Sequence, residues 1–228
     1  MKNKLEINHS DPEEGSTFSH PFFSVIITAY NRADLITRAL DSLIAQTEKD
    51  WEAIIVDDGS TDNTYCRVLI YFKSHSEITC IRQPHKGTAA AKNTGLWSAT
   101  GRYITFLDSD DEFNRNHLES RRTILTQNPS VKFLYGGTKI LGNQYVPDRF
   151  DNRKKINLNE CIIGGTFFIE RKTALSLNGF RDIIVGEDAD LFDRAKRDHV
   201  TMMEVGQQTY VYHHETTDSI TNQLSVSL

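Results

Sequence analysis

The stretch Tyr103-Ile104-Thr105-Phe106-Leu107-Asp108-Ser109-Asp110-Asp111 joins a short apolar run to three carboxylates within four positions. The apolar run is typical of a buried strand in a parallel sheet, and the polar residues mark its end. Crowding Asp108, Asp110 and Asp111 is unfavourable because like charges repel, unless a cation lies among them. Oxygen ligands favour magnesium, manganese or calcium, and a site with few protein ligands suits an ion that substrate phosphates complete. The alternative is a set of solvated turn carboxylates that cap the next helix.

The same pattern of a strand followed by a helix recurs upstream of this stretch. Apolar runs at 22–27, 53–56 and 78–81 predict three strands, and helical spacing follows at 35–44 and again after Gly87. Strands that alternate with helices indicate an α/β fold, with a mostly parallel central sheet flanked by helices on both faces and right-handed crossovers.

The second half of the chain has a less regular pattern, which predicts a mixed and partly antiparallel arrangement. We expect a helix at 117–127 and strands at 133–135, 164–169, 200–205 and 209–212. The polar stretch 143–159 shows little periodicity. A helix that begins after Gly186 carries Leu191, Phe192 and Ala195 on one face.

Polar residues follow the first two strands as well as the fourth. Thr28-Ala29-Tyr30 and Asp57-Asp58 both come directly after apolar runs, and ligands of such sheets bind at the carboxyl ends of the strands. Asp57 to Asp62 is also an ordinary turn and helix-cap sequence, so a structural role stays open. No GxGxxG follows the first strand, which argues against a nicotinamide dehydrogenase and a P-loop enzyme.

Charge and cysteine content narrow the class of protein. A net charge of −5, from 26 basic and 31 acidic residues, gives no reason to expect nucleic acid as a partner. Three widely spaced cysteines without a CxxC pair suggest neither a disulfide framework nor a zinc site, so we expect a cytoplasmic location. No stretch approaches the roughly 20 apolar residues of a membrane span, so any contact with the cytoplasmic membrane face would be peripheral.

Six blocks of sequence, taken in order over about residues 22 to 215, resemble the family 2 glycosyltransferases, which are inverting enzymes of GT-A fold. The blocks are Ser24 to Arg32, Ser42 to Thr47, Ile55 to Asp62, Ala91 to Gly95, Phe106 to Asp111 and Gly186 to Asp188. The resemblance implies a GT-A fold and a nucleotide-diphosphate sugar as donor, with uridine the commonest base. The acceptor would be a sugar, a lipid-linked intermediate or a protein.

The resemblance also implies which residues hold the donor. These are Thr28, Tyr30, Arg32, Asp57, Asp58, Lys92 and Asp108. Thr28, Tyr30 and Asp58 would hold the base with help from Asp57, and Asp108 would contact the ribose or the donor sugar. Lys92 stands where the family usually carries arginine.

The resemblance implies a divalent metal, Mn²⁺ or Mg²⁺, that bridges the diphosphate and is held by Asp110. A histidine of many relatives lies near the metal or the diphosphate, and either His213 or His214 matches it; we assign the metal to Asp110 and His214, with His213 as the other candidate. Asn93 and Asp111 are further candidate site residues.

By the same resemblance, Asp188 is the general base and Glu187 its neighbour in the site. Inversion at the anomeric carbon requires one carboxylate that deprotonates the acceptor hydroxyl as it attacks from the face opposite the leaving nucleotide. Taken alone, the pair could equally lie at a helix N-terminus as a dipole partner.

Two departures from the family pattern bear on function. The first block reads Ile27-Thr28-Ala29-Tyr30 where Pro-Thr-Tyr is commoner, and the Gln-x-x-Arg-Trp pattern of processive synthases is missing. A single-addition transferase is therefore the expectation. We expect the loops from Asn143 to Gly165 to determine the sugar and the acceptor.

Three rival functions remain at this point. A nucleotidyltransferase of similar fold usually has a Gly-rich basic loop after its first strand, which Thr28 to Arg32 does not supply. An idle nucleotide-sugar-binding module would not need intact Asp110 and Asp188. A phosphatase of the haloacid dehalogenase type would carry its Asp-x-Asp after the first strand, not the fourth.

For the organisation of the chain we expect a mobile arm at 1–20, a single catalytic domain at 21–214 and a polar tail at 215–228. Within the domain, 21–112 would form the nucleotide-sugar half and 113–214 the acceptor half. The tail is a candidate lid over the donor. The sequence does not indicate the oligomeric state.

Overall fold

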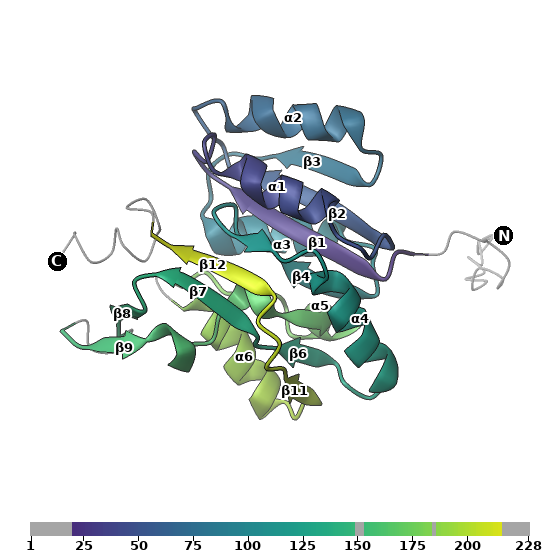
Figure 1. Ribbon diagram of the computed structural model, residues 1–228, viewed down its shortest axis with the longest axis vertical. Coiled ribbons are helices and arrows are strands. Elements are labelled where there is room, and N and C mark those ends of the chain that lie inside the picture. Colours follow the sequence, from purple (N-terminus) through teal and green to yellow (C-terminus); the bar gives the residue numbers. More distant parts are fainter. Residues whose placement is uncertain (1–19, 149–152, 184–185, 216–228) are drawn as a thin grey trace, which may run out of the picture.

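The computed structural model describes residues 20–148, 153–183 and 186–215. The expected arm and tail lie, apart from His20 and Glu215, outside the described residues. Two layers of helices enclose a seven-stranded sheet, and a three-stranded sheet lies beside it (Figure 1). No described helix is both long enough and apolar enough to cross a membrane.

The first half consists of strands and helices in strict alternation. The elements are β1 (Phe23–Ala29), α1 (Ile36–Ile44), β2 (Trp51–Asp57), α2 (Thr64–Ser74), β3 (Ile78–Arg82), α3 (Thr88–Ser98) and β4 (Tyr103–Phe106). Strands β3, β2, β1 and β4 lie side by side and run parallel, with Ile26 opposite both Ile54 and Phe106. The α/β fold with a mostly parallel sheet is confirmed.

The second half completes the large sheet and adds the smaller ones. Its elements are β5 (Glu112–Phe113), α4 (His117–Gln127), β6 (Phe133–Tyr135), β7 (Thr138–Gly142), β8 (Tyr145–Pro147), β9 (Lys155–Asn157), β10 (Phe168–Glu170), α5 (Arg171–Ser176), α6 (Glu187–Arg197), β11 (Met202–Glu204) and β12 (Tyr210–His214). The sheet order is β11-β6-β10-β4-β1-β2-β3, and β10 runs antiparallel to both of its neighbours. The expectation of a mixed half is confirmed.

Both faces of the large sheet are buried, which explains why its strands are apolar at consecutive positions. Val25 and Ile27 of β1 pack on one face with buried residues of α1, α2 and α4. Ile26 packs on the other face with residues of α3, α5 and α6. Alternating side chains of a strand point to opposite faces, so a strand between two helical layers has no position for a polar side chain that faces water.

Two expectations for the second half were wrong in detail. The segment 164–169 is not one strand: a single 3₁₀ turn covers Gly164–Thr166, and β10 begins at Phe168. A side chain at Gly164 would clash with Asp188, and one at Gly165 would clash with the Tyr210 ring. The polar stretch 143–159 is not irregular throughout, because it contains the antiparallel pair of β8 and β9.

His117 is a buried titratable group where α4 meets the small sheet. Its ring stacks on Phe113 with 4.1 Å between centroids, and Nδ1 lies 2.7 Å from Thr209 Oγ1. Burial, and secondly the Arg121 guanidinium, lower the pKa of His117 well below its usual value. The folded protein therefore holds His117 neutral at pH values where the unfolded chain protonates it.

We expect His117 to make the protein less stable in mild acid. The stability that its neutral form contributes is complete above the unfolded pKa of about 6.5, and is lost at about 1.4 kcal/mol per pH unit as the pH falls below that value. Urea unfolding at pH 7 and pH 5 should show a loss of about 2 kcal/mol from this group, and His117→Phe should remove that part of the slope. His20→Phe, at an exposed position, should retain it; equal slopes in wild type and His117→Phe would contradict the prediction.

Candidate active site

A cavity of about 660 Å³ opens at the carboxyl ends of β1, β2 and β4. We call it the strand-end cavity. The strand order reverses between β1 and β4, and ligands of open α/β sheets bind at such a switch point. Nine of the residues expected from the sequence line the cavity: Thr28, Tyr30, Arg32, Asp58, Lys92, Asp108, Asp110, Glu187 and Asp188.

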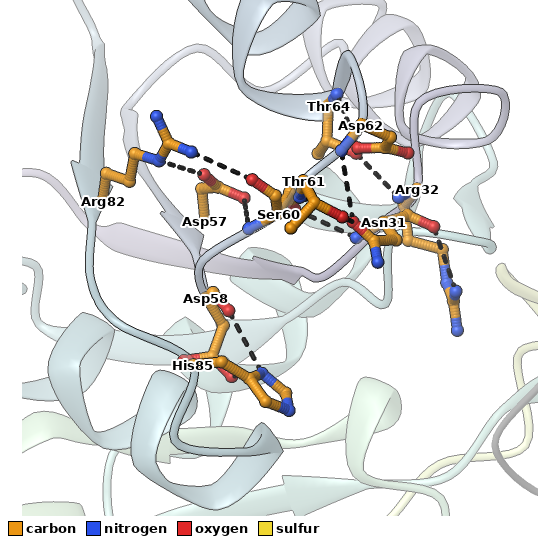
Figure 2. A network of polar contacts seen from close by, with 10 residues as sticks. All are labelled: Asn31, Arg32, Asp57, Asp58, Ser60, Thr61, Asp62, Thr64, Arg82 and His85. Carbon is orange, nitrogen blue, oxygen red and sulfur yellow. Dashed lines mark hydrogen bonds and ion pairs between the residues drawn. The ribbon is translucent and has the colours of Figure 1, made fainter.

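The loops that follow β1 and β2 are tied together by their own polar groups (Figure 2). Asn31 takes a left-handed conformation, with φ of 52°, and its backbone N–H donates to Ser60 Oγ at 3.0 Å. The Asn31 side-chain oxygen accepts from the Thr61 N–H at 2.9 Å, and the Arg32 N–H donates to Thr64 Oγ1 at 2.7 Å. These bonds fix the backbone that presents Tyr30 and Arg32 to the cavity.

The Asp58 carboxylate organises a third loop, between β3 and α3. It accepts hydrogen bonds from the backbone N–H groups of Lys86, at 3.0 Å, and Gly87, at 2.8 Å. It also accepts from Gln83 Nε2 at 2.7 Å and lies 2.8 Å from His85 Nδ1 (Figure 2). Because these four partners hold the loop between β3 and α3 against Asp58, this residue fixes the shape of the cavity wall as well as lining the cavity.

His85 is a cavity residue that the sequence did not indicate. Its ring stacks on Tyr30, with 3.9 Å between centroids and 20° between planes, and both residues line the cavity. The stacked pair forms an aromatic surface of the cavity, with Tyr30 in the loop after β1 and His85 in the loop between β3 and α3. No sequence signal marks His85, because its role depends on a contact with Tyr30 across 55 positions of the chain.

A group of carboxylates that line the cavity surrounds one lysine. Lys92 Nζ lies 2.7 Å from Asp188 Oδ1 and 3.4 Å from Glu187 Oε1, and the Lys92 side chain is only 4% exposed. Burial alone lowers the pKa of Lys92, but Asp188, Asp108 and Glu187 together outweigh it and hold the pKa above its ordinary value. Lys92 is therefore the buried cation of this cluster.

The pKa of Asp108 reflects its burial and the repulsion between the carboxylates of the cluster. Burial raises its pKa to about 6, Lys92 opposes the shift, and the carboxylates of Asp110, Asp188 and Glu187 add to it. A cation next to these groups would lower their mutual repulsion.

Asp188 is held by two donors at the start of α6. Asp188 Oδ1 accepts a hydrogen bond from Lys92 Nζ, and Oδ2 accepts one from the Gly164 N–H at 3.2 Å. The side chain stays 22% exposed, and it borders the cavity. A carboxylate fixed at both oxygens but still accessible is suited to accept a proton from a bound hydroxyl.

The other five expected residues do not border the strand-end cavity in the described part of the chain: Asp57, Asn93, Asp111, His213 and His214. Asp57 accepts from the Ser60 N–H and lies 3.1 Å from Arg82 Nε (Figure 2). Asn93 exchanges two hydrogen bonds with the backbone of Phe180. Asp57 and Asn93 therefore bind neighbouring backbone and do not line the cavity.

Asp111 links the loop that carries Asp108 and Asp110 to the last strand, β12. It accepts from Tyr210 OH at 2.6 Å and from the His213 N–H at 2.7 Å. His213 Nε2 lies 3.2 Å from Glu112 Oε1. His214 Nδ1 lies 2.5 Å from the backbone oxygen of Asn143. His214 Nε2 is buried without a hydrogen-bond partner among the described residues.

The acidic side of the cavity has the chemistry of a divalent-cation site with few protein ligands. No group of three or more His, Cys, Asp or Glu side chains within residues 20–148, 153–183 and 186–215 could hold a metal ion by itself. An ion that keeps waters and is completed by substrate phosphates needs only one or two carboxylates. Asp110 lines the cavity, and Arg38 holds its backbone oxygen. The residues present therefore fit a Mg²⁺ or Mn²⁺ ion that is shared with a diphosphate.

Comparison with known proteins identifies the family. The sequence profile of glycosyl transferase family 2 matches residues 24–176, which is more than half of the chain. The chain belongs to glycosyl transferase family 2. The family expected from the sequence is confirmed.

Two related bacterial sequences are named as glycosyltransferases. The chain is 35% identical over 158 residues to the Escherichia coli UDP-Glc:alpha-D-GlcNAc-diphosphoundecaprenol beta-1,3-glucosyltransferase WfgD, covering 67% of this chain and 61% of WfgD. It is 36% identical over 132 residues to the putative teichuronic acid biosynthesis glycosyltransferase TuaG of Bacillus subtilis, covering 57% of this chain and 52% of TuaG. The chain thus spans between half and two thirds of the length of these relatives.

Solved structures of glycosyltransferases share the fold. The mannosyltransferase PcManGT from Pyrobaculum calidifontis, in complex with GDP-Man and Mn²⁺, has a TM-score of 0.72 at 21% identity, covering 91% of this chain and 60% of PcManGT. S. aureus TarS in complex with UDP-GlcNAc has a TM-score of 0.71 at 20% identity, covering 85% and 59%. The expected GT-A fold is confirmed.

Proposed function

We propose that this family 2 protein transfers a sugar from a nucleotide-diphosphate sugar to an acceptor hydroxyl, with inversion at the anomeric carbon. The observation that carries the proposal is the placement of Asp188 in the same cavity as Asp108 and Asp110. One carboxylate can then act on the acceptor while the others act on the donor side.

In the proposed reaction Asp188 accepts the proton of the acceptor hydroxyl. The hydroxyl oxygen forms a bond to the anomeric carbon, and the bond from that carbon to the diphosphate oxygen breaks, so that the nucleoside diphosphate leaves with the bonding electrons. The Tyr30 and His85 rings would offer the base a stacking surface, and Asp108, which lines the same cavity, would contact the ribose or the sugar. A divalent ion held by Asp110, with His214 as the further candidate ligand, would offset charge on the leaving diphosphate.

The relatives suggest the class of substrates. WfgD is named for a UDP-linked donor and a diphosphoundecaprenol-linked acceptor, and TarS is found with UDP-GlcNAc. We therefore propose a UDP-sugar as donor and a lipid-linked glycan as acceptor, in polysaccharide synthesis at the cytoplasmic membrane face. A nucleotidyltransferase would instead need a pyrophosphate-binding loop after β1, where Asn31 and Arg32 bind the β2 loop.

Thermal unfolding with nucleoside diphosphates should test the donor assignment. A ligand that binds only the folded state raises stability by RT ln(1 + [L]/Kd), which is about 2.7 kcal/mol at a ligand concentration of 100 Kd. We expect UDP with Mn²⁺ to raise the melting temperature more than UDP with EDTA, and more than GDP or dTDP with Mn²⁺. A response to GDP or dTDP in place of UDP would reassign the donor base, and no response to any of them would refute the proposal. Binding without turnover over a panel of acceptors would favour an idle binding module.

Gly164→Ala should disturb the base while it preserves the fold. The new methyl group would clash with the Asp188 carboxylate, which must rotate away, and a displacement of about 1 Å at a catalytic group can lower the rate by about 10²-fold. We expect kcat to fall by about 10- to 100-fold, with little change in the affinity for UDP. Gly101→Ala is the control variant for Gly164→Ala. Its new side chain clashes with Ser24 at the other end of the sheet and not with Asp188. A kcat that stays at the wild-type value in Gly164→Ala would show that the position of Asp188 does not limit the reaction.

A further inference from the structure

A second cavity of about 360 Å³ lies next to the strand-end cavity. Leu158, Cys161, Ile162 and Ile163 line both cavities, so this short segment is a shared wall. The volume lies within the range of about 300–1,000 Å³ that is usual for small-molecule sites. The catalytic argument above leaves this second cavity without a role.

The second cavity lies one helical turn from the proposed base. Phe192 of α6 lines the second cavity, and Asp188, four residues earlier on the same helix, lines the strand-end cavity. Residues four apart on a helix share one face, with about 5–6 Å between their Cβ atoms. Ile163 lines both cavities, and the next residue, Gly164, donates to Asp188. A molecule in the second cavity is therefore close enough to present a hydroxyl group to Asp188.

Glycine backbone forms one side of the second cavity, and a buried arginine braces it from behind. Gly136 and Gly137 have φ of 92° and 81°, values that side chains other than glycine rarely adopt. Arg121, which is completely buried, donates to the Gly136 oxygen at 3.3 Å and to the Gln207 oxygen at 3.0 Å. Its guanidinium thus links the Gly136-Gly137 turn to the loop that carries Gly206, and Figure 1 shows these segments together between β6, β7 and β11.

The lining of the second cavity combines aromatic rings with neutral and acidic polar groups. Tyr135 and Phe192 meet edge to face with 4.8 Å between centroids, and Asn159 lines the cavity with the carboxylates of Glu160 and Glu204. None of the described residues that line it is a lysine or an arginine. Aromatic faces, amides and carboxylates can bind the hydroxyl groups and ring of a sugar. Two carboxylates repel a phosphate, and the nearby Arg121 guanidinium is already bound to the backbone oxygens of Gly136 and Gln207.

We propose that the second cavity binds an uncharged sugar unit of the acceptor, and that a phosphate or diphosphate of the acceptor stays outside it. This proposal rests on the proposed transferase function, since it assigns the acceptor for that reaction. The sugar unit lies against the Gly136-Gly137 turn and Gly206, and it directs the reacting hydroxyl across Ile163 to Asp188. The acidic lining would then select the neutral end of a lipid-linked glycan.

A titration of the ¹⁵N-labelled full chain followed by NMR tests this assignment. The probes are glucose, galactose, mannose, their N-acetylated 2-amino forms and the corresponding 1-phosphates, each with UDP and Mn²⁺ present. We expect at least one neutral sugar to shift the amide signals of Gly136, Gly137 and Gly206, and its 1-phosphate to bind more weakly at the same amides. A 1-phosphate that binds these amides more tightly than the neutral sugar would overturn the proposal, and so would a panel that shifts none of them.

Gly206→Trp gives a matched variant for the same titration. A Cβ at Gly206 would meet nothing within 4 Å, and the residue lines the second cavity without a positive φ, so an indole can occupy space there without strain. We expect Gly206→Trp to lose the sugar-dependent shifts and to keep the shift of the Gly87 amide on addition of UDP. Ser76→Trp, an exposed position before β3 at the other edge of the sheet, should keep both responses.

Failure of this proposal and failure of the transferase function give different results. Sugar binding in Gly206→Trp equal to that of wild type would overturn the proposal while the UDP response stays intact. A UDP response that is missing in wild type would instead refute the donor site on which the proposal rests.

Discussion

Asp188→Asn is expected to lower kcat by about 10²–10⁴, the range that is typical of a lost general base. An asparagine amide keeps the size of the side chain but cannot accept the proton of the acceptor hydroxyl. Because Asp188 lies at the start of α6, whereas the aromatic surface is formed by Tyr30 and His85 in the loops after β1 and β3, the affinity for UDP should change little. Steady-state rates at saturating donor and acceptor, together with the Kd for UDP, measure the two effects separately.

Two control variants on α6 make this prediction specific. Asp198→Asn, an exposed change at the other end of the helix, should leave kcat unchanged. Glu187→Gln removes the more distant partner of Lys92, at 3.4 Å, and should lower kcat less than Asp188→Asn does. If Glu187→Gln has the larger effect, Glu187 and not Asp188 is the base; if neither variant changes kcat, the base lies elsewhere.

The fold of the first half could be predicted from the sequence because burial there has a simple pattern. A strand covered by helices on both faces is apolar at consecutive positions, as Val25, Ile26 and Ile27 are, and a helix such as α1 buries one regular stripe. Polar residues also mark the carboxyl end of each of these strands, so the positions of Thr28, Asp58 and Asp108 at one edge of the sheet followed from the sequence.

The second half was harder to predict because its elements are short and depend on contacts between distant segments. Strands β5 and β8 contain two and three residues, too few for a period to show. The Gly164–Thr166 turn depends on Asp188 and Tyr210, which lie much further along the chain. The five-residue strand β7 alternates Lys139 with the half-buried Ile140, but it pairs with β12 across some 70 positions.

For the candidate site, the chemical groups could be predicted but not the way in which each is held. A carboxylate after a strand can line the cavity, as Asp110 does, or bind a neighbouring backbone, as Asp57 and Asp111 do. These alternatives look the same in sequence, since both use an acidic residue at the same edge of the sheet. Partners such as Tyr210, which donates to Asp111, decide between them, and they lie too far along the chain for spacing to reveal.

Lys92→Met is expected to lower the free energy of unfolding by about 3–5 kcal/mol, the usual effect of removing one partner from a buried ion pair. Methionine occupies a similar volume but leaves Asp188, Glu187 and Asp108 without the buried cation that offsets their repulsion. A group whose pKa is raised in the folded state contributes its full stabilisation below its unfolded pKa, about 10.4 for lysine. The loss should therefore be complete at pH 7, where urea unfolding measures it.

Two comparisons separate burial of the charge from the mere loss of an ion pair. Lys132→Met removes a pair of similar length, 2.6 Å to Glu170, but the Lys132 side chain is 37% exposed, and such pairs contribute about 0–1 kcal/mol. The double variant Lys92→Met with Asp188→Asn removes one of the uncompensated carboxylates, so it should be more stable than Lys92→Met alone. A similar loss for the two lysine variants, with no recovery in the double variant, would mean that the cluster does not depend on Lys92 for its stability. Recovery would show that the carboxylates of the proposed active site lower the stability of the fold unless a cation is buried among them.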